Sequence, residues 1–576
     1  MPSTYDELKR RALAEAQVAG LGGRPVITVG MGICGVSAGA REVYAALQDE
    51  LKKQGVDAVL HPVGCVGFCY AETLVDIARP GQPRISYKNI TPERVPELVR
   101  DAVTGANLRS DLALGAWGAS PSPAIPNIHE FPEWKHQVRI ATRNCGVVDP
   151  ENTLDYIARG GYAALNKALF DMKPDQVIDE VIKSNLRGRG GAAFPTGQKW
   201  KFLAGSPGPV KYILCNGEEG DAGAFNDKAL LESDPNTVLE GIILAGYATR
   251  ATKGYIFIRC EHWLPIQRAR RAIKQAYDLG ILGKNIMGSE FSFDAAVAQT
   301  GESYVSGEET ALMEAIEGRR AMPRPRPPFP AAVGLWGKPS NINNVKTYSY
   351  VPEIVARGGA WYASVGSERS KGTGLVCLSG DIRKPGLYEL PFGLPLTAVI
   401  RDVGGGCPDG KKVKFLQTGG PLGGFLPASL MEKTPMDFDA MNATGAMFGS
   451  GGIIVGSEDA CVVDVTRVLT EFNADESCGK CFPCRLGTHH INQIMSRIAE
   501  GKGRPQDMQT ALGLAPSLAA SLCAHGQLAT NPIRTAYQYF KDEIEAHIKE
   551  RRCPAGRCAA MRSHGSGALA GAGNKR

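Results

Sequence analysis

The sequence has no hydrophobic stretch long enough to cross a membrane. Its apolar runs, such as Gly241–Ala248, fall far short of the roughly 20 residues that a spanning helix needs. No positively charged segment followed by an apolar one opens the chain, as it would in a secretory signal. Thr4 and Glu7 instead predict a capping box at the start of an amphipathic helix. We therefore expect no direct membrane insertion and a soluble, cytoplasmic protein.

The sequence also lacks a strong excess of charge. Its net charge is +6 over 576 residues, and much of the surplus lies between Lys549 and Arg562 and at the last two residues. No aromatic side chains alternate with these cations, as they would in a nucleic-acid-binding surface. We therefore expect no nucleic-acid partner. The Gly-, Ala- and Ser-rich end of the chain is predicted to be a disordered, solvated tail.

Cysteine, in contrast, is abundant. An odd count of 15 in a chain without a secretory signal argues against a disulfide framework and for thiolate ligands. Nine cysteines fall into three groups, which are Cys34/Cys65/Cys69, Cys478/Cys481/Cys484/Cys523 and Cys553/Cys558. Five others are interpreted as ordinary thiols, namely Cys145, Cys215, Cys260, Cys377 and Cys407. The role of Cys461 stays open.

The length exceeds what one hydrophobic core can organise, so several domains are expected, and the fold class is α/β multidomain. A β-α-β-β-α pattern near the N-terminus is typical of a thioredoxin-like module, and alternating strands and helices follow it. One long helix is predicted over Ala229–Ala248. The predicted units are the thioredoxin-like module at 1–105, a linker at 106–135, an α/β domain at 136–365, a β-grasp-like domain at 366–457, a helical bundle at 458–550, and a Cys-pair segment with a flexible tail at 551–576.

The strongest metal signal is Cys478-x2-Cys481-x2-Cys484, with Cys523 following 39 residues later. Three thiolates at this spacing can wrap one face of a cubane, and a distant fourth thiolate can close it. Zinc rarely needs three cysteines so close together, and chance is a poor explanation of the spacing. A helix is expected to start near Gly487. The sequence therefore predicts a [4Fe-4S] cluster.

Two kinds of segment predict a ligand site in the α/β domain. The glycine-rich segment Leu186–Trp200 allows its backbone N–H groups to approach a phosphate or a flavin edge, and Lys199 supplies a cation. A plain glycine-rich turn is the alternative. Asn216–Phe225 and Gly301–Leu312 each carry acidic side chains, and the first follows the end of a predicted strand, where α/β proteins bind ligands. Each acidic pair, taken alone, is better explained as part of a solvated loop.

These segments, together with Arg324–Pro330 and Gly334–Val345, closely resemble the NADH-binding flavoprotein subunit of respiratory complex I. They also resemble its relatives in NAD-reducing hydrogenases and NAD-dependent formate dehydrogenases, over about residues 136–550. The resemblance implies that 136–365 is the FMN- and NADH-binding domain, and that 366–457 is of the SLBB type. It implies FMN held by Gly188, Gly190, Gly191, Lys199, Asn216, Glu219, Tyr304, Gly307, Glu308, Asn343 and Asn344. It implies NADH held by Phe194, Phe202, Asp221, Glu309, Arg326 and Phe329.

The sequence departs from the family pattern at three places. Arg326 replaces the usual lysine of the proline-rich loop, and Ala193 replaces the glycine that usually precedes the Phe-Pro pair. Asn216-Gly217-Glu218 stands for the usual Asn-Ala-Asp. These changes bear on individual contacts and not on the fold.

The resemblance also implies a mechanism and partners. NAD(H) exchanges hydride with FMN, no protein acid or base is required, and single electrons pass to the [4Fe-4S] cluster. Such a diaphorase subunit works with a small [2Fe-2S] thioredoxin-like subunit and a larger iron–sulfur or catalytic subunit. The complex can be a hydrogenase, a formate dehydrogenase or an electron-bifurcating enzyme. The alternative is a non-catalytic docking or assembly subunit that retains the fold.

The two outer cysteine groups are less complete. Cys65-x3-Cys69 resembles half of a thioredoxin-like [2Fe-2S] site, but only Cys34 is available for the other half. Three thiolates and a non-cysteine ligand could hold the cluster, or the cluster is lost and the module serves docking. Cys553 and Cys558 could form a zinc site with Cys461 and His547, as bifurcating relatives suggest. The alternative for this pair is two reduced, idle thiols.

Overall fold

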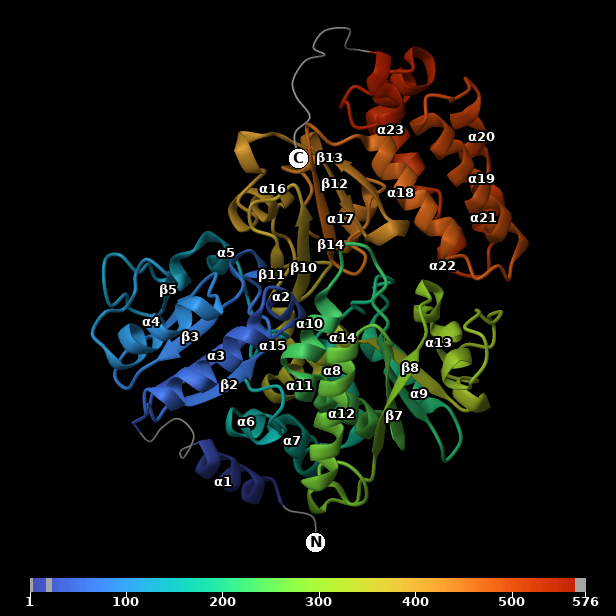
Figure 1. Ribbon diagram of the computed structural model, residues 1–576. Helices are drawn as coiled ribbons and strands as arrows, with labels where there is room; N and C mark the ends of the chain where they lie inside the picture. The colour runs from blue at the N-terminus through green and yellow to red at the C-terminus, as the bar shows by residue number, and fades with distance from the viewer. Residues whose placement is uncertain (1–3, 17–22, 565–576) are drawn as a thin grey trace.

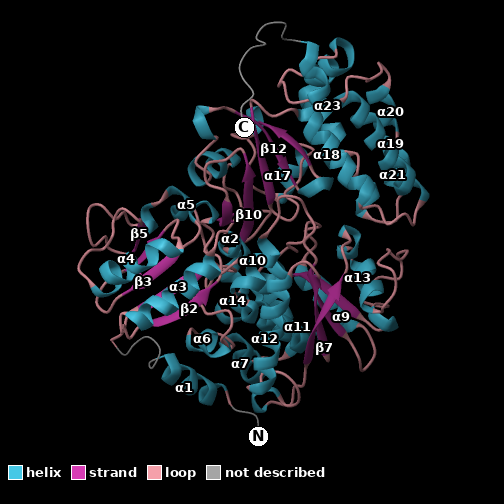
Figure 2. Ribbon diagram, in the orientation of Figure 1, coloured by secondary structure: helices cyan, strands magenta, loops and turns pink. Residues whose placement is uncertain are grey.

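The structure is a computed structural model that describes residues 4–16 and 23–564. It contains three β-sheets and a group of C-terminal helices (Figure 1). We call the sheets the N-terminal, parallel and mixed sheets, in the order in which the chain enters them. Helices pack around each of them (Figure 2). The predicted disordered tail lies outside the described residues from 565 onward. In the described part of the chain, no helix is long and apolar enough to cross a membrane.

Helix α1 (Tyr5–Ala16) begins with the predicted capping box. The Thr4 backbone N–H donates to Glu7 Oε2 at 2.8 Å, and the Glu7 N–H donates to Thr4 Oγ1 at 3.4 Å. One face of the helix is buried in the core that surrounds the parallel sheet, through Tyr5, Leu8 and Ala12. Although α1 opens the chain, it therefore packs beside α6 rather than on the N-terminal sheet (Figure 1).

The N-terminal sheet has the strand order β2-β1-β3-β4-β5. Strands β1 and β2 are parallel, and the remaining neighbours are antiparallel. Its strands are β1 (Val26–Gly30), β2 (Val59–Val63), β3 (Val75–Ala78), β4 (Arg84–Tyr87) and β5 (Ala113–Trp117). Its helices are α2 (Ile33–Ser37), α3 (Ala40–Lys53), α4 (Val95–Leu98) with a π-helical extension (Val99–Thr104), and the short α5 (Pro132–Lys135).

The linker predicted over residues 106–135 is wrong at 113–117, because β5 lies there and pairs with β4. The Trp117 indole N–H donates to Ser86 Oγ at 2.8 Å. A Cβ on Gly115 would lie only 2.7 Å from the Pro126 carbonyl oxygen and from the Ile128 side chain. The small residues that suggested a linker therefore permit close packing at the edge of the sheet.

The parallel sheet has the order β8-β7-β6-β9, with all strands parallel. Its strands are β6 (Tyr212–Gly217), β7 (Lys253–Arg259), β8 (Asp294–Thr300) and β9 (Ser340–Asn344). The helices around it are α6 (Thr153–Ala158), α7 (Ala163–Asp171), α8 (Pro174–Lys183), α9 (Thr196–Gly205), α10 (Asn226–Ser233), α11 (Pro235–Thr249), α12 (Trp263–Asp278), α13 (Glu309–Ile316), α14 (Val345–Arg357) and α15 (Gly359–Ala363).

The long helix predicted over Ala229–Ala248 is two helices, α10 and α11. Pro235 has no backbone N–H and suits the first turn of a new helix. Asp234 precedes it in a non-helical conformation, and its carboxylate accepts the Thr237 N–H at 3.0 Å. A side-chain cap of this kind starts α11 and ends α10.

The mixed sheet has the order β11-β10-β14-β12-β13. Its edge strand β13 is four residues long and was not predicted from the sequence, because it is too short to show an alternating pattern. The elements of this region are β10 (Thr373–Gly380), β11 (Gly386–Pro391), β12 (Val413–Thr418), β13 (Gly424–Pro427), β14 (Gly452–Ser457), α16 (Leu396–Ala398) and α17 (Phe438–Ala443).

The C-terminal helices share a core with the mixed sheet through Phe415 and Phe425. Helix α19 begins at Phe482, earlier than the start predicted near Gly487, because Pro483 is well tolerated in a first helical turn. The helices are α18 (Val462–Asp475), α19 (Phe482–Ala499), α20 (Asp507–Gly513), α21 (Ala515–Ala519), α22 (Ala524–Leu528) and α23 (Asn531–Glu545).

Candidate functional site

The glycine-rich loop lies against the carboxyl end of β9. A Cβ on Gly190 would lie 3.1 Å from the Asn344 Cβ, and Gly191 has a φ of +111°, which favours glycine. The loop continues into α9, and this helix carries Lys199. The sequence thus brings a bare backbone and a cation to the edge of the parallel sheet, where α/β proteins bind ligands.

Amide side chains from two neighbouring strands converge at this edge. Asn216 of β6 lies opposite Asn344 of β9 in the parallel register. The Asn216 Nδ2 donates to the Gly307 carbonyl at 2.7 Å, and the Asn344 Nδ2 donates to Asp227 at 2.6 Å. Asn343, one residue earlier, accepts from the Trp200 indole N–H at 3.1 Å. The predicted amides therefore lie together, although long segments separate them in the sequence.

Two cations and two carboxylates meet beside the loop. Lys199 forms an ion pair with Glu309 and donates to the Ile342 carbonyl at 2.8 Å. The Arg326 guanidinium lies 3.7 Å from Glu309 and 3.8 Å from Glu308. The Glu308 carboxylate also caps α13 by accepting two backbone N–H groups. These predicted residues therefore form one charged group. Within it, the Glu308 carboxylate is already hydrogen-bonded to the backbone of α13.

The acids after β6 differ in their surroundings. Burial raises the pKa of Glu218 to about 8, although Arg259 lies 2.9 Å away. Glu219 is engaged at the start of α10, where its carboxylate accepts the Asp227 and Lys228 backbone N–H groups at 2.8 and 2.9 Å. Glu218 is therefore expected to change its protonation near neutral pH.

The three aromatic residues predicted to contact NADH are all exposed. Phe194 of the glycine loop is 45% exposed, Phe202 of α9 is 51% exposed, and Phe329 of the proline-rich loop is 61% exposed. Large apolar side chains left in water are typical of surfaces that meet a ligand or a partner. Their contact with a nucleotide stays a prediction.

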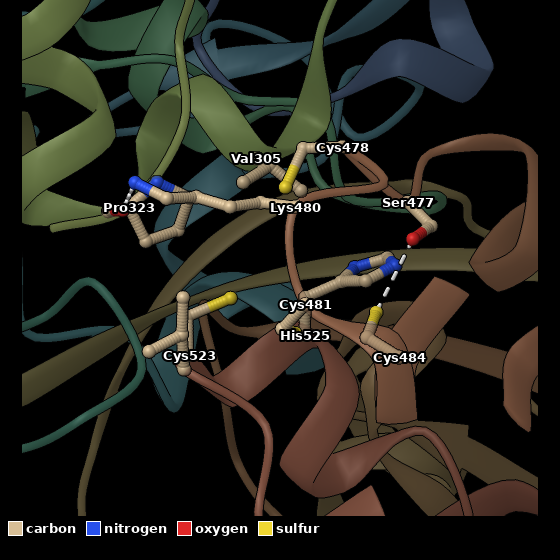
Figure 3. Close-up of a pocket in the computed structure, with 10 residues that line it drawn as sticks. Val305, Pro323, Ser477, Cys478, Lys480, Cys481, Cys484, Cys523 and His525 are labelled. Carbon is tan, nitrogen blue, oxygen red and sulfur yellow. Dashed lines mark hydrogen bonds between the residues drawn. The ribbon is translucent and has the colours of Figure 1, made fainter. Parts of the chain in front are cut away.

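The four cysteines predicted to hold a cluster line one pocket, together with Val305, Pro323, Lys480 and His525. Figure 3 shows the sulfur atoms of Cys478, Cys484 and Cys523 pointing into a common space. Cys484 lies in the first turn of α19, Cys523 directly precedes α22, and the Ser477 hydroxyl lies 3.3 Å from the Cys484 sulfur. Four thiols around one enclosed space fit a [4Fe-4S] cluster.

Tyr304 connects the acidic residues to this pocket. Its hydroxyl donates to Asp221 at 2.7 Å, and burial raises the pKa of Asp221. Its ring centroid lies 5.7 Å from that of His525, which lines the cysteine pocket, and the next residue, Val305, lines the pocket as well. The candidate flavin site and the candidate cluster site therefore share one short segment.

Cys461, His547, Cys553 and Cys558 form a second group, with ligand atoms that all lie within 4.8 Å of one another. The Cys461 and Cys558 sulfurs are 3.7 Å apart, and His547 Nε2 lies 3.4 and 3.5 Å from them. Tetrahedral zinc with ordinary bond lengths would separate two sulfurs by about 3.8 Å and a sulfur and a nitrogen by about 3.6 Å. The group therefore fits a zinc ion.

His547 is oriented by a hydrogen bond on its other nitrogen. Its Nδ1 lies 2.7 Å from the Glu543 carbonyl oxygen, which can only accept, so Nδ1 carries the proton and Nε2 presents its lone pair to the sulfurs. This arrangement is usual for histidines that bind metals.

The N-terminal cysteines also converge. Cys34 lies in the first turn of α2, and Cys65 and Cys69 follow β2. A hydrogen bond from the Cys69 thiol lowers the pKa of Cys34 to about 7, and the Gly67 N–H donates to the Cys65 sulfur at 3.2 Å. Burial raises the pKa of Glu72 to about 8 beside Cys34. The three thiols therefore lie together beside one buried carboxyl group. This proximity is what a three-cysteine cluster site requires.

Several residues of the site were not predicted from the sequence. They are Arg259, which pairs with Glu218; Lys346, which pairs with Asp227; Ser450, which donates to Asp221; and His525 and Ser477, which lie at the cysteine pocket. Arg259 and Ser450 come from segments without a recognisable pattern, so the sequence offered no signal for them. Ser477, His525 and Lys346 lie within two residues of the predicted motifs, and that proximity could have identified them.

Comparison with protein families finds three matches along the chain. Residues 181–353 match the Nuo51 FMN-binding domain, and residues 375–426 match the SLBB domain. Residues 464–547 match the iron–sulfur binding region of NADH-ubiquinone oxidoreductase-F. The first match includes the glycine loop and the amide side chains. The iron–sulfur match includes all four cysteines of the pocket, Cys478, Cys481, Cys484 and Cys523.

The chain is also similar to whole proteins. It is 45% identical over 428 residues to the HndC subunit of the NADP-reducing hydrogenase of Solidesulfovibrio fructosivorans, covering 74% of this chain and 87% of that protein. It is 43% identical over 416 residues to an F-type subunit of the NADH-quinone oxidoreductase of Rhizobium meliloti, covering 72% and 99%. A chain of an NAD+-reducing [NiFe]-hydrogenase superposes with a TM-score of 0.63 at 27% identity, covering 94% of this chain and 90% of that one.

Proposed function

This chain belongs to the family of NADH-oxidising flavin and iron–sulfur subunits that includes the F-type subunits of NADH-quinone oxidoreductases, and we propose that it feeds nucleotide electrons into a larger complex. FMN, when bound, supplies an acceptor that takes two electrons as hydride and releases them singly. The chain's own contribution is to bind, orient and shield that cofactor, and to hold a [4Fe-4S] cluster near it.

One observation carries this proposal, namely the shared segment Tyr304–Val305. The Tyr304 hydroxyl contacts Asp221 on the flavin side, and Val305 lines the four-cysteine pocket. Electron transfer between two cofactors requires that the protein hold them close together. A single segment that borders both sites supports such closeness without an intervening domain.

Different residues around the glycine loop suit different parts of the flavin and the nucleotide. The bare backbone at Gly190 and the amides of Asn216 and Asn344 suit a flavin and its ribityl chain, because they offer donors and acceptors without bulk. Lys199 and Arg326 bring positive charge for phosphate groups. The exposed ring of Phe329 offers a face on which a nicotinamide or adenine ring can stack.

The surface near the cysteine pocket supports a partner at that end. Phe482 directly follows Cys481 and is 66% exposed, and Leu486 lies one turn later on the same face of α19 at 39% exposure. An apolar surface beside a cluster ligand favours a protein that covers it and receives the electrons. We assign this position to the larger iron–sulfur or catalytic subunit. We also propose a small [2Fe-2S] thioredoxin-like subunit as a second partner, and a cytoplasmic location for the protein.

The finer domain assignments belong to the same proposal. The N-terminal sheet would be the thioredoxin-like module, the mixed sheet the β-grasp-like domain, and the helices after Cys461 the cluster domain. In the N-terminal module, Cys34, Cys65 and Cys69 would hold a [2Fe-2S] cluster with a non-cysteine ligand, and without a cluster the module would serve docking. A structural zinc ion would hold the segment with Cys553 and Cys558 to the start of α18 and to the helical turn that follows α23.

The proposal can be tested by the visible spectrum of the full-length protein, purified without oxygen and reconstituted with FMN, iron and sulfide. We expect a flavin band and broad iron–sulfur absorption, both bleached by NADH or NADPH. Titration with each nucleotide separately would establish which one is the substrate. A colourless protein after reconstitution, or colour that neither nucleotide bleaches, would contradict the proposal and favour a docking subunit.

A matched pair of variants sharpens the test. Lys199→Met removes the cation beside the glycine loop, and Lys201→Met removes an exposed cation two residues later on the same helix. We expect the first variant to lose flavin affinity by about 10- to 100-fold, the usual cost of a charge-assisted contact, and the second to behave like the wild type.

A further inference from the structure

The two arginines of the glycine loop are less exposed than the glycine that lies at the site. Arg187 and Arg189 alternate with Gly188 and Gly190 in the sequence, and the loop turns at Arg189 and Gly190. Gly190 is exposed at the site and lies beside Asn344, whereas Arg189 is buried. The positive charge that Arg189 gives this loop therefore lies inside the protein and not at the exposed glycine.

Hydrogen bonds from Arg189 link the loop to the segment that leads into the mixed sheet. Its guanidinium donates to the Tyr362 hydroxyl at 3.0 Å and to the Lys371 carbonyl at 2.7 Å. It also donates back to the Arg187 carbonyl at 2.9 Å, and its backbone N–H donates to Thr347 Oγ1 at 3.0 Å. One side chain thus links the loop to two later segments.

Arg187 contacts both the loop itself and α17. Its Nε donates to the Ala193 carbonyl at 3.0 Å, which closes the turn, and its two terminal nitrogens lie 3.3 and 3.4 Å from the Asp439 carboxylate of α17. The guanidinium also lies 5.0 Å from the centre of the Phe438 ring. Both arginines therefore contact residues of the mixed-sheet region or of the segment that leads into it.

The charge of Arg189 is unusual because none of its hydrogen-bond partners is a carboxylate. The side chain is 2% exposed, and aromatic rings surround it, with the centre of the Phe392 ring at 4.7 Å. Ring faces and carbonyl oxygens stabilise a buried cation less well than a paired acid does. Such a residue is expected where it serves the shape of a site rather than the stability of the fold.

We propose that Arg187 and Arg189 are positioning residues that hold the glycine loop in its flavin-binding shape, and that neither binds the flavin phosphate. The inference rests on the proposed function, because it assumes that the loop binds FMN. It also means that the mixed-sheet region, which supplies no predicted flavin contact, helps to build the flavin site. Loss of either anchor should weaken the binding of the whole flavin.

The experiment compares the affinities of the apo-flavoprotein for FMN and for riboflavin, which lacks the phosphate, by flavin fluorescence titration. The variants are Arg189→Met, Arg189→Lys and Arg187→Met, and Arg369→Met removes an exposed arginine nearby as the control. We expect Arg189→Met to weaken both flavins by the same factor, about 100-fold for a displaced binding loop. Arg187→Met should weaken both by about 10-fold, as expected for one charge-assisted hydrogen bond.

Arg189→Lys should recover little, because an ammonium group cannot reproduce the forked donors. The iron–sulfur absorption and the thermal midpoint of each apo-variant report whether it has folded, and if Arg189→Met has not, Arg187→Met carries the test. A loss confined to FMN would show phosphate binding and overturn the inference, as would unchanged affinity for both flavins in folded variants. If the wild-type protein binds neither flavin, the proposed function fails instead.

Discussion

The sulfur atoms of Cys461 and Cys558 lie 3.7 Å apart, although 97 residues separate them in the sequence. Cys461 stands at the N-terminus of α18, and Cys558 follows the last long helix. His547 and Cys553 complete the group. The fold thus brings four metal-ligating side chains together at the end of the described chain.

Replacing this histidine should remove a metal ion. We expect the wild-type protein to contain about one zinc per chain and His547→Ala to contain much less, because the remaining three thiols leave a tetrahedral site open. Metal binding is coupled to folding, so the variant and a chelator-treated wild type should both unfold at lower temperature. Elemental analysis and thermal unfolding measure the two effects. Cys407→Ser, a buried cysteine outside the group, is the control, and equal zinc content in all three proteins would refute the site.

The four-cysteine pocket makes a separate prediction. Cys523→Ser should lower the iron content by about four atoms per chain and remove this cluster's share of the broad iron–sulfur absorption, because the cluster loses the ligand that closes its far side. Flavin binding should persist, since the glycine loop belongs to a different region, but bleaching of the cluster by nucleotide should disappear. Iron content and low-temperature electron paramagnetic resonance provide the measurement, with Cys260→Ser as an exposed control. A Cys523→Ser protein with a full iron complement would contradict this assignment.

Ala193 adopts a conformation that suits glycine. Its φ is +53°, in the left-handed region, which costs a residue with a side chain about 1 kcal/mol. Ala193→Gly should therefore raise the free energy of unfolding by up to about 1 kcal/mol, while its carbonyl still accepts from Arg187. Ala192→Gly, one residue earlier, has no such strain to relieve and should lower the free energy of unfolding slightly. Chemical denaturation of both variants compares them, and a loss in both would argue against strain at Ala193.

Glu232 predicts a dependence of stability on pH. Its carboxylate accepts the Ile33 N–H at 2.8 Å, and burial raises its pKa from 4.5 to about 7. Between these values the folded protein retains a proton that the unfolded chain has released, so the free energy of unfolding falls as the pH rises through this window. The loss above neutral pH amounts to about 3 kcal/mol.

Glu232→Gln should remove that loss, since an uncharged amide can still accept from Ile33. The variant should be more stable than the wild type at about pH 8, and the two should differ little at about pH 5. Chemical denaturation at both pH values tests this, with the exposed Glu42→Gln as the control. A variant that is no more stable than the wild type at the higher pH would show that Glu232 is not a buried, protonated carboxyl group.

Patterns that are local in the sequence predicted their structure well. The spacing of Cys478, Cys481 and Cys484 placed three ligands at one pocket, because a short turn and one helical turn bring them together. Two strands of the parallel sheet, β6 and β7, were recognisable from short apolar runs, whereas β8 and β9 were not predicted. In contrast, the break at Asp234–Pro235 was missed because the apolar pattern continues across it, and β5 was missed because small residues suggested a linker.

The sequence by itself determined the family, the cofactor types and the residue types that bear on them, because these depend on spacings within short segments. Only the tertiary structure decided which distant side chains meet: Arg259 with Glu218, Tyr304 with both candidate sites, and Arg189 with the carbonyl of Lys371. Such meetings depend on how sheets and helices pack, and no short segment contains that information. The same packing gives Arg187 and Arg189 of the glycine-rich loop their partners, Asp439 and the Lys371 carbonyl, in or just before the mixed-sheet region.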